Sequence, residues 1–304
     1  MCNSLIQLIE NVYADLDLEA NWDHPHVAGW MGMFRRWARQ PAFRRTWNVS
    51  ETTYADRLRN FYNDRLRGRP MRLPRGFVAY REAVAGKTPQ DSLDHYTGAI
   101  RVGASVIELE VRKLASGELV VCPDSTIEKK QIEHWTSTGR TPNGVQLQGG
   151  IQLLTLEGCL HELHNRTRLC VALKTKGIEG AALKALQTRG WSYDDYTISS
   201  DGPPVIHELR QACSDVALGL HVTIGDLFTK AFDDFLLSGA DYLAPHADIV
   251  TPDQLRRARE AHVPLVPWVV NEADQLRLFL AHDAVAGVIS NNAELALKIR
   301  GVLS

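Results

Sequence analysis

The sequence lacks the features that mark membrane, secreted or zinc-binding proteins. No window approaches about 18 uninterrupted apolar residues, which excludes a membrane-spanning helix. The five cysteines are an odd number without C-x-x-C spacing, so they indicate neither a disulfide framework nor a zinc site. Residues Met1–Leu5 contain no basic region and lead into no long apolar core, which argues against secretion. We therefore expect a cytoplasmic protein.

An excess of charge of one sign is also absent. The formal net charge of −2 indicates no particular class of partner, and the sequence specifies no oligomeric state. Neither an internal repeat nor a low-complexity tract is visible. The 304 residues are enough for one (β/α)₈ barrel of about 250 residues and an extension.

Short apolar runs alternate with helical patterns along most of the chain, which is typical of a parallel barrel. This alternation predicts an α/β fold, a (β/α)₈ TIM barrel over residues 74–304, preceded by a helical extension over residues 1–73. The predicted strands are 77–81, 105–111, 168–174, 195–200, 216–222, 241–246, 264–270 and 285–290.

An interruption follows the second predicted strand. The run 118–122 predicts a hairpin return with its turn at Ser116-Gly117. Segment 123–150 is rich in Lys, Gln, Thr and Gly, and predicts a long loop above the barrel mouth. Such a loop is either solvated or reaches a ligand through Lys129, Lys130, His134 and Arg140.

Two acids in the second predicted strand, Glu108 and Glu110, are the most informative pair. Alternation along a strand places both carboxylates on one face. There they repel each other unless a cation lies between them. A divalent ion such as Mg²⁺ or Ca²⁺, or a neighbouring Lys or Arg, is therefore expected. The alternative, one carboxylate in solvent at a strand end, stays open.

From Phe77 onward, the order of segments resembles the glycerophosphodiester phosphodiesterase family within the phospholipase-C-like barrels. Each segment alone is weak evidence of a resemblance, but all of them in this order are specific for the fold. The matching segments are Phe77–Arg81, Pro89–Leu93, Ile107–Val111, Gly117–Ile127, Leu154–Glu157, Cys170–Lys174, Val266–Asn271 and Gly287–Asn291.

The resemblance implies a catalytic centre that this sequence does not complete. The family uses two histidines as general acid and base, and it binds a divalent cation through the two acids of a Glu-x-Asp strand and a third Glu. Tyr80, Pro123 and Ala172 occupy the positions of the two histidines and the third ligand. A phenol is a poor proton shuttle at neutral pH, proline has no side-chain proton and alanine ligates nothing. Hydrolysis by the family route is not expected.

Other polar positions match the family, and the C-terminal ends of the barrel strands are where function is expected. The candidate catalytic residues are Tyr80, Arg81, Lys174, His221 and His246. The candidate substrate-binding residues are Arg81, Ser200, Trp268 and Asn271, and the candidate metal ligands are Glu108 and Glu110. A purely structural polar layer, in which Lys174 is a counter-ion and each histidine is only hydrogen-bonded, is the alternative.

Three functions of different classes remain open. The first is a divergent enzyme that applies non-hydrolytic acid–base chemistry, of lyase, cyclase or transferase type, to a small phosphorylated or anionic molecule. The second is a non-catalytic ligand- or protein-binding pseudoenzyme. The third is a metal-dependent phosphodiesterase with a rearranged site.

The N-terminal extension combines helical patterns with aromatic residues and arginines. Residues 4–16 form one predicted amphipathic helix, and Ser50 is the predicted N-cap of another that continues to Leu66. From Met31 to Arg75 twelve arginines face three acids, a local excess of +9. Anion, substrate or nucleic-acid binding is one interpretation. A helical cap whose aromatic residues are buried is the interpretation that we favour, and nucleic acid is not expected.

The segment Asp23-His24-Pro25-His26 has the residue types of a metal site. A turn before a helix explains the same residues, and we favour it.

Overall fold

The barrel strands follow one another around a parallel sheet. The computed structural model describes residues 2–38, 41–66, 76–81, 88–213, 216–224, 228–261 and 263–303. In spatial order the sheet runs β12-β11-β10-β9-β2-β1-β13. The strands are β1 (Phe77–Arg81), β2 (Val106–Lys113), β9 (Arg168–Leu173), β10 (Tyr196–Ser200), β11 (Ala217–Val222), β12 (Tyr242–Pro245) and β13 (Gly287–Ser290).

An eighth extended segment, residues 264–268, closes the sheet between β12 and β13. Leu265 forms parallel bridges with Leu243 on one side and Val285 on the other. The amide of Val266 donates to the Leu243 carbonyl at 2.8 Å, and that of Ala286 donates to the Leu265 carbonyl at 2.8 Å. The predicted (β/α)₈ barrel is confirmed.

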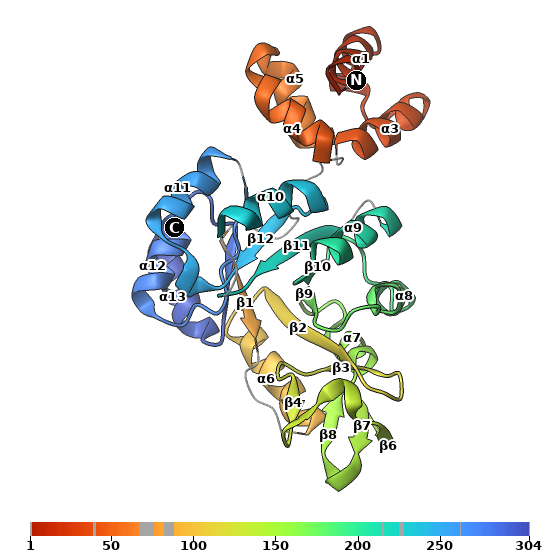
Figure 1. The fold of residues 1–304 in the computed structure, drawn as a ribbon, viewed down its shortest axis with the longest axis vertical. Helices are drawn as coiled ribbons and strands as arrows, with labels where there is room; N and C mark the ends of the chain where they lie inside the picture. Colours follow the sequence, from red (N-terminus) through yellow and green to blue (C-terminus); the bar gives the residue numbers. More distant parts are fainter. Residues whose placement is uncertain are drawn as a thin grey trace.

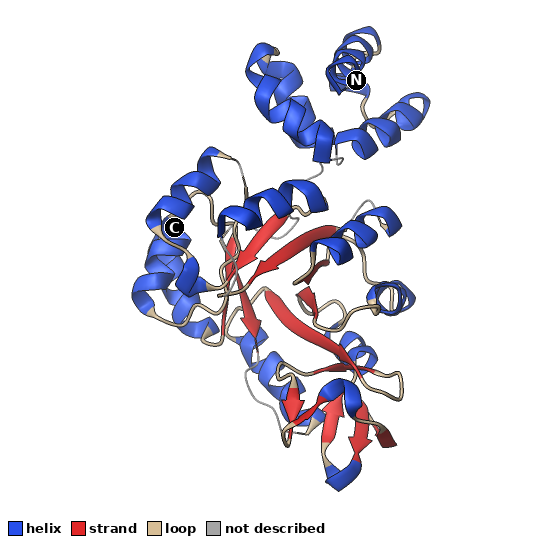
Figure 2. Cartoon of the chain, in the orientation of Figure 1, coloured by secondary structure: helices blue, strands red, loops and turns tan. Residues whose placement is uncertain are grey.

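Helices cover the outside of this cylinder (Figure 2). Thr88 and Asp91 form a capping box at the start of α6, and Thr251 and Gln254 form one at the start of α11. The eight barrel helices are α6 (Pro89–Arg101), α7 (Leu156–Leu163), α8 (Glu179–Thr188), α9 (Pro203–Ala212), α10 (Phe228–Ser238), α11 (Pro252–Glu260), α12 (Ala273–Ala281) and α13 (Ala293–Leu303).

Alternation along the strands divides the barrel core into two layers. The outer layer, between sheet and helices, contains side chains such as Val78, Ile107 and Leu109. The inner layer contains Phe77, Ala79, Val106, Cys170, Tyr242, Ala244, Val266 and Ile289. Strand residues two positions apart point to the same side, so residues in step with this inner layer have inward parity and those in step with the outer layer have outward parity. This parity decides which polar side chains at the strand ends face the barrel axis.

The N-terminal residues form a separate helical unit beside α10 (Figure 1). Its helices enclose an apolar cluster of their own that includes Phe34, Phe43 and Trp47. The predicted boundary at residues 73 and 74 lies outside the described residues. The elements are α1 (Cys2–Asp15), α2 (Leu18–Asn21), η1 (Pro25–Val27), α3 (Ala28–Ala38), α4 (Pro41–Ser50), η2 (Glu51–Thr53), α5 (Asp56–Phe61) and η3 (Tyr62–Leu66).

Ser50 occupies the N-cap position of η2, but its side chain makes no capping hydrogen bond, and the helix predicted to continue to Leu66 is interrupted where Tyr54 and Ala55 are extended. Ser50 is the last residue of α4, and its hydroxyl donates to the Thr46 carbonyl at 2.8 Å instead of accepting from a following amide. The turn predicted before a helix is present, because the backbone N–H of His26 donates to Nδ1 of His24 and α3 begins at Ala28.

Three arginines whose side chains are described have partners inside the helical unit. Arg57 pairs with Glu19, Arg59 pairs with Asp56, and the guanidinium of Arg65 lies 4.2 Å from the Trp22 ring centroid. For these three arginines the contacts are structural, as the interpretation of a helical cap with buried aromatic side chains expects.

The segment after β2 is a small packed subdomain, so the prediction of a long loop over 123–150 is wrong. Its core contains Val120, Ile132, Trp135 and Leu147 among other side chains. The hairpin return is present, since β3 pairs antiparallel with β2. The strands are β3 (Leu119–Val121), β4 (Thr126–Ile127), β5 (Lys130–Gln131), β6 (Ser137–Thr141), β7 (Gly144–Leu147) and β8 (Gln152–Leu154), with turns η4 (Ile132–His134) and η5 (Gln148–Gly150).

Among the helices described, none has both the length and the apolarity that crossing a bilayer requires.

The inner layer provides a test of barrel packing. Gly219 pairs with Tyr242 in the β11–β12 register, and a Cβ at residue 219 would lie 2.3 Å from Cζ of the Tyr242 ring. We expect Gly219→Ala to lower the free energy of unfolding by about 1–3 kcal/mol, because the enclosed ring must move. Urea unfolding of the variant and of the natural chain measures this loss of stability. Gly180→Ala in α8, which meets no atom within 4 Å, is the control and is expected to show no loss. Equal stability of the two variants would contradict this packing.

Candidate functional site

Glu108 and Glu110 both point into the barrel. They share the inward parity of Val106, and both are buried, at 4% and 6% exposure. In the parallel register Glu108 lies between Arg81 and Cys170, and Glu110 lies beside Ala172. Ala172 therefore places only a methyl group next to Glu110 on the inner face.

Two cations neutralise these carboxylates. One guanidinium nitrogen of Arg81 lies 2.6 Å from Oε2 of Glu110, and its Nε lies 3.8 Å from Oε2 of Glu108. Lys174 Nζ lies 3.7 Å from Oε1 of Glu110. Like charges at this range are stable inside a protein only with such counter-charges. The expectation of a Lys or Arg beside the acids is met.

A second group of contacts extends from Lys174 to the next two strands. Its Nζ lies 3.1 Å from Oδ1 of Asp201 and 2.9 Å from Nδ1 of His221. The same Asp201 oxygen lies 3.0 Å from Nδ1 of His221. Nε2 of His221 is buried and has no hydrogen-bond partner within the described residues. Lys174, Asp201 and His221 therefore form a closed triangle with one imidazole nitrogen unused.

Trp268 forms the wall that joins the two groups. Its ring centroid lies 5.7 Å from the Arg81 guanidinium, 5.4 Å from Lys174 Nζ and 5.5 Å from the His221 ring. The indole Nε1 donates to the Ala244 carbonyl at 2.7 Å, which fixes the ring. Cation–π contacts of this kind hold charged side chains against an apolar surface.

The environment moves the pKa values of the buried groups apart. Burial, with repulsion from Glu110 in addition, raises the pKa of Glu108 to about 7. Burial, with the charge of Lys174 in addition, lowers the pKa of His221 to about 4. Burial alone would raise the pKa of Asp201, but its contacts with His221 and Lys174 outweigh this and keep that pKa well below its usual range. A carboxyl with a pKa near neutrality and an imidazole with a pKa well below it thus belong to the same end of the barrel.

The donor set does not fit the metal centre that the resemblance implies. Across the described parts of the chain, no group of three or more His, Cys, Asp or Glu side chains could hold a metal ion. Arg81 and Lys174 occupy the oxygens of Glu110 that a cation would use, and Ala172 supplies no ligand. Mg²⁺ or Ca²⁺ on Glu108 and Glu110 stays a prediction that would require Arg81 to leave its partner.

Two candidates take other positions. Tyr80 has the outward parity of Val78 and packs edge-on against Tyr96 in the layer beneath α6. Ser200 has the outward parity of Ile198, and the neighbouring Asp201 faces the cluster instead. Both side chains are therefore on the wrong face for the predicted roles.

The two remaining candidates make local contacts. Oδ1 of Asn271 accepts from the backbone N–H of Asn291 at 3.0 Å and from the Ser290 hydroxyl at 3.3 Å. These bonds join the chain after segment 264–268 to the end of β13. Nδ1 of His246 accepts from the Asp248 amide at 3.3 Å, and the ring lies edge-on to Trp268 at 5.2 Å. His246 thus borders the cluster, with Nδ1 used in a local turn.

Asp201 is the residue that the sequence prediction missed. It directly follows β10, at the strand end where polar side chains were sought, and shifting the choice by one residue from Ser200 reverses the face. An acid immediately after a predicted strand was the available signal.

Several solved structures share the architecture of this chain. No protein-family model and no curated protein matches the sequence. A glycerophosphodiester phosphodiesterase from Parabacteroides distasonis superposes with a TM-score of 0.58 at 19% identity, covering 75% of this chain and 98% of that one. A second, from Agrobacterium tumefaciens, has a TM-score of 0.57 at 17% identity, covering 73% and 99%. This chain has the fold of the glycerophosphodiester phosphodiesterases.

A third neighbour of this fold contains a ligand. The Oleispira antarctica phosphodiesterase, in complex with the product sn-glycerol-3-phosphate, has a TM-score of 0.57 at 16% identity and covers 74% of this chain and 96% of that one. The resemblance to glycerophosphodiester phosphodiesterases in the sequence is thus confirmed for the fold.

The raised pKa of Glu108 predicts a pH-dependent stability difference. Between its ordinary pKa of 4.5 and about 7, the folded chain keeps a proton that the unfolded chain has lost. This stabilisation is complete below pH 4.5 and is lost as the pH rises through 7. Relative to the natural chain, Glu108→Gln is therefore expected to gain about 1–3 kcal/mol in free energy of unfolding from pH 5 to pH 8.

Urea unfolding at both pH values tests this, with Glu110→Gln as the matched comparison. Glu110→Gln removes the partner of two buried cations and should cost about 3 kcal/mol or more at pH 8. A pH-independent difference between Glu108→Gln and the natural chain would contradict the assignment.

Proposed function

We propose that this chain is a divergent enzyme that applies non-hydrolytic acid–base chemistry to a small phosphorylated or carboxylated molecule. The observation that carries the proposal is Glu108: it is buried, its Oε2 has no hydrogen-bond partner among the described residues, and its pKa is raised to about 7. A carboxyl in this state exchanges protons at neutral pH, which an ordinary structural carboxylate does not.

The cations of the cluster are suited to an anionic ligand. Arg81 and Lys174 reach Glu110 from two sides, and both lie against the Trp268 ring. When Glu108 carries its proton, the charges of these cations balance those of Glu110 and Asp201. An entering anion then meets two cations and a carboxylic acid, all of which donate hydrogen bonds. The product complex of the Oleispira antarctica protein supports a small phosphorylated ligand.

Two groups supply the proton transfers. His221 is neutral at physiological pH, and its free Nε2 is the proposed acceptor of a substrate proton. For Nε2 to accept a proton, Nδ1 must carry the ring hydrogen and donate it to Asp201, which orients the ring, while Lys174 pairs with the same Asp201 oxygen. Protonated Glu108 is the proposed donor. An acid and a base held in different protonation states by their surroundings are typical of enzymes that move protons at neutral pH.

In a transfer or cyclisation, a hydroxyl of the substrate or of an acceptor attacks phosphorus, and the bond from phosphorus to the departing oxygen breaks. His221 takes the proton of the attacking hydroxyl, and Glu108 gives its proton to the departing oxygen. Water does not enter the product, which distinguishes this route from hydrolysis.

The two alternatives differ in what they require. A non-catalytic binder is favoured by the loss of both family histidines, at Tyr80 and Pro123, and would retain a ligand without turning it over. A metal-dependent phosphodiesterase would need a cation on Glu108 and Glu110 and would add water to its product.

Oxygen-18 labelling separates hydrolysis from the proposed chemistry. The protein is incubated in H₂¹⁸O with glycerophosphodiesters and phosphorylated alcohols, with and without EDTA, and products are followed by ³¹P NMR and mass spectrometry. We expect turnover that resists EDTA and incorporates no ¹⁸O. Glu108→Gln and His221→Gln should each lose about 100-fold or more in kcat.

His207→Gln, an exposed side chain on α9, is the control and should retain full activity. Incorporation of ¹⁸O that depends on added Mg²⁺, Ca²⁺ or Mn²⁺ would favour the metal-dependent phosphodiesterase and contradict the proposal.

Ligand retention tests the binding site without knowledge of the reaction. Native mass spectrometry of the purified chain is expected to reveal a bound small anion, and Arg81→Met, which removes a charge that faces both acids, should release it. Arg256→Met on the exposed face of α11 is the matched control, because its charge pairs only with neighbours on its own helix. Equal occupancy in both variants would place the site elsewhere.

A further inference from the structure

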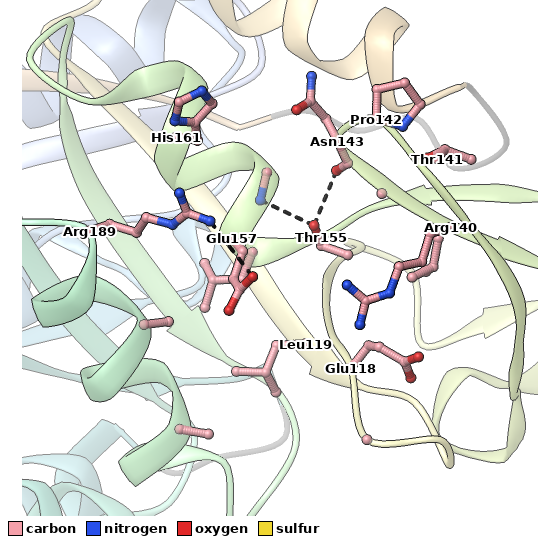
Figure 3. A pocket seen from close by; sticks show the side chains of 17 residues that line it. Glu118, Leu119, Arg140, Thr141, Pro142, Asn143, Thr155, Glu157, His161 and Arg189 are labelled. Atoms are coloured by element: carbon pink, nitrogen blue, oxygen red, sulfur yellow. Dashed lines mark hydrogen bonds and ion pairs between the residues drawn. The ribbon is translucent and has the colours of Figure 1, made fainter.

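A cleft of about 440 Å³ lies on the flank of the barrel, between the subdomain after β2 and helices α7 and α8 (Figure 3). The β2–β3 hairpin and the β6–β7 turn form one side, and the N-terminal half of α7 and one face of α8 form the other. Its volume falls within the range of small-molecule sites. None of its lining residues belongs to the charged cluster inside the barrel.

The walls of this flank cleft are fixed by tight backbone packing. The Asn143 carbonyl accepts from both the amide and the hydroxyl of Thr155, at 3.0 and 3.2 Å, which fastens the β6–β7 turn to the start of α7. A Cβ at Gly158 would lie 2.2 Å from that same carbonyl oxygen. The cleft is therefore a preformed feature of the fold.

One wall contains an acid, Glu118, and a cation, Arg140. Oε2 of Glu118 and Oγ1 of Thr141 are shielded from solvent and have no hydrogen-bond partner among the described residues. Burial alone would raise the pKa of Glu118, but hydrogen bonds from Ser116 and Ser137 and the charge of Arg140 keep it below its usual value. Glu118 is thus an anion with an unused oxygen, and Arg140 is an exposed cation beside it.

The opposite wall has the same combination of charges. Arg189 lies 3.8 Å from Glu157, and both side chains are well exposed. His161 follows one turn further along α7, and Figure 3 shows these side chains across the cleft from Glu118 and Arg140. The floor between the walls is apolar and consists of Leu119, Val145, Leu156, Ala181 and Ala185.

We propose that this flank cleft is a second ligand site, which takes a small zwitterion of the amino-acid or dipeptide class with an apolar side chain. The ammonium group would lie against the Glu118 carboxylate, whose side chain must rotate to turn its unused oxygen to the cleft, and the ligand carboxylate would face Arg140. The apolar side chain would lie on the floor. An unpaired buried carboxylate oxygen selects for a donor, and guanidinium groups select for a carboxylate. This inference does not depend on the reaction proposed for the barrel.

Calorimetric titration with L-leucine and L-leucyl-L-leucine tests the assignment. N-acetyl-L-leucine, which lacks the ammonium group, and isopentylamine, which lacks the carboxylate, should each bind about tenfold more weakly or worse. Glu118→Gln and Arg140→Gln should weaken leucine or dipeptide binding to a similar extent. Ala181→Trp, which fills the cleft from α8, should abolish it.

Lys184→Trp, on α8 but outside the cleft lining, controls for the bulk of the indole and should bind as the natural chain does. His221→Gln should also bind normally, because it alters only the barrel cluster. Failure of both zwitterions to bind the natural chain, or binding unchanged in Glu118→Gln and Ala181→Trp, would overturn the inference. Binding lost in His221→Gln would assign the ligand to the barrel mouth and overturn it too.

Discussion

Neutralisation of two inward-facing carboxylates by Arg81 and Lys174 is the interaction on which the barrel mouth depends. Glu108 and Glu110 cannot both remain in the inner layer without these cations, because repulsion adds to the cost of removing each carboxylate from water. The cations in turn are held by the Trp268 ring, whose indole is fixed to a neighbouring strand end. The same contacts therefore neutralise the charges at this end of the barrel and hold the side chains that carry them in place.

The network also shows how a fold shared with glycerophosphodiester phosphodiesterases accommodates this charged cluster. Ala172 pairs with Glu110 in the strand register and supplies no ligand, and the side chains of Arg81 and Lys174 contact the Glu110 oxygens. In the proposed chemistry, proton exchange would fall to Glu108 and His221. Glu108 lies on a strand that the sequence resemblance identifies, whereas the strand of His221 was predicted from periodicity alone.

The sequence predicted the barrel well because strand periodicity and segment order are set by burial, which every barrel strand must satisfy. It also predicted that both acids share a face with a cation between them. It did not predict the sheet in the subdomain after β2, since short strands with few apolar residues resemble loops until their partners are known. The choice of Ser200 over Asp201 failed because a strand end can be located only to within about a residue, and one residue reverses the face.

The half-exposed position of Asp201 has a consequence for the buried imidazole. Its side chain is 49% exposed, while the side chain of His221, which it contacts, is 2% exposed. Asp201 therefore connects the buried Lys174–His221 contact to solvent. In the proposed chemistry, a proton accepted by the buried ring would have this half-exposed carboxylate as its route to solvent, so the imidazole would return to its neutral form between turnovers.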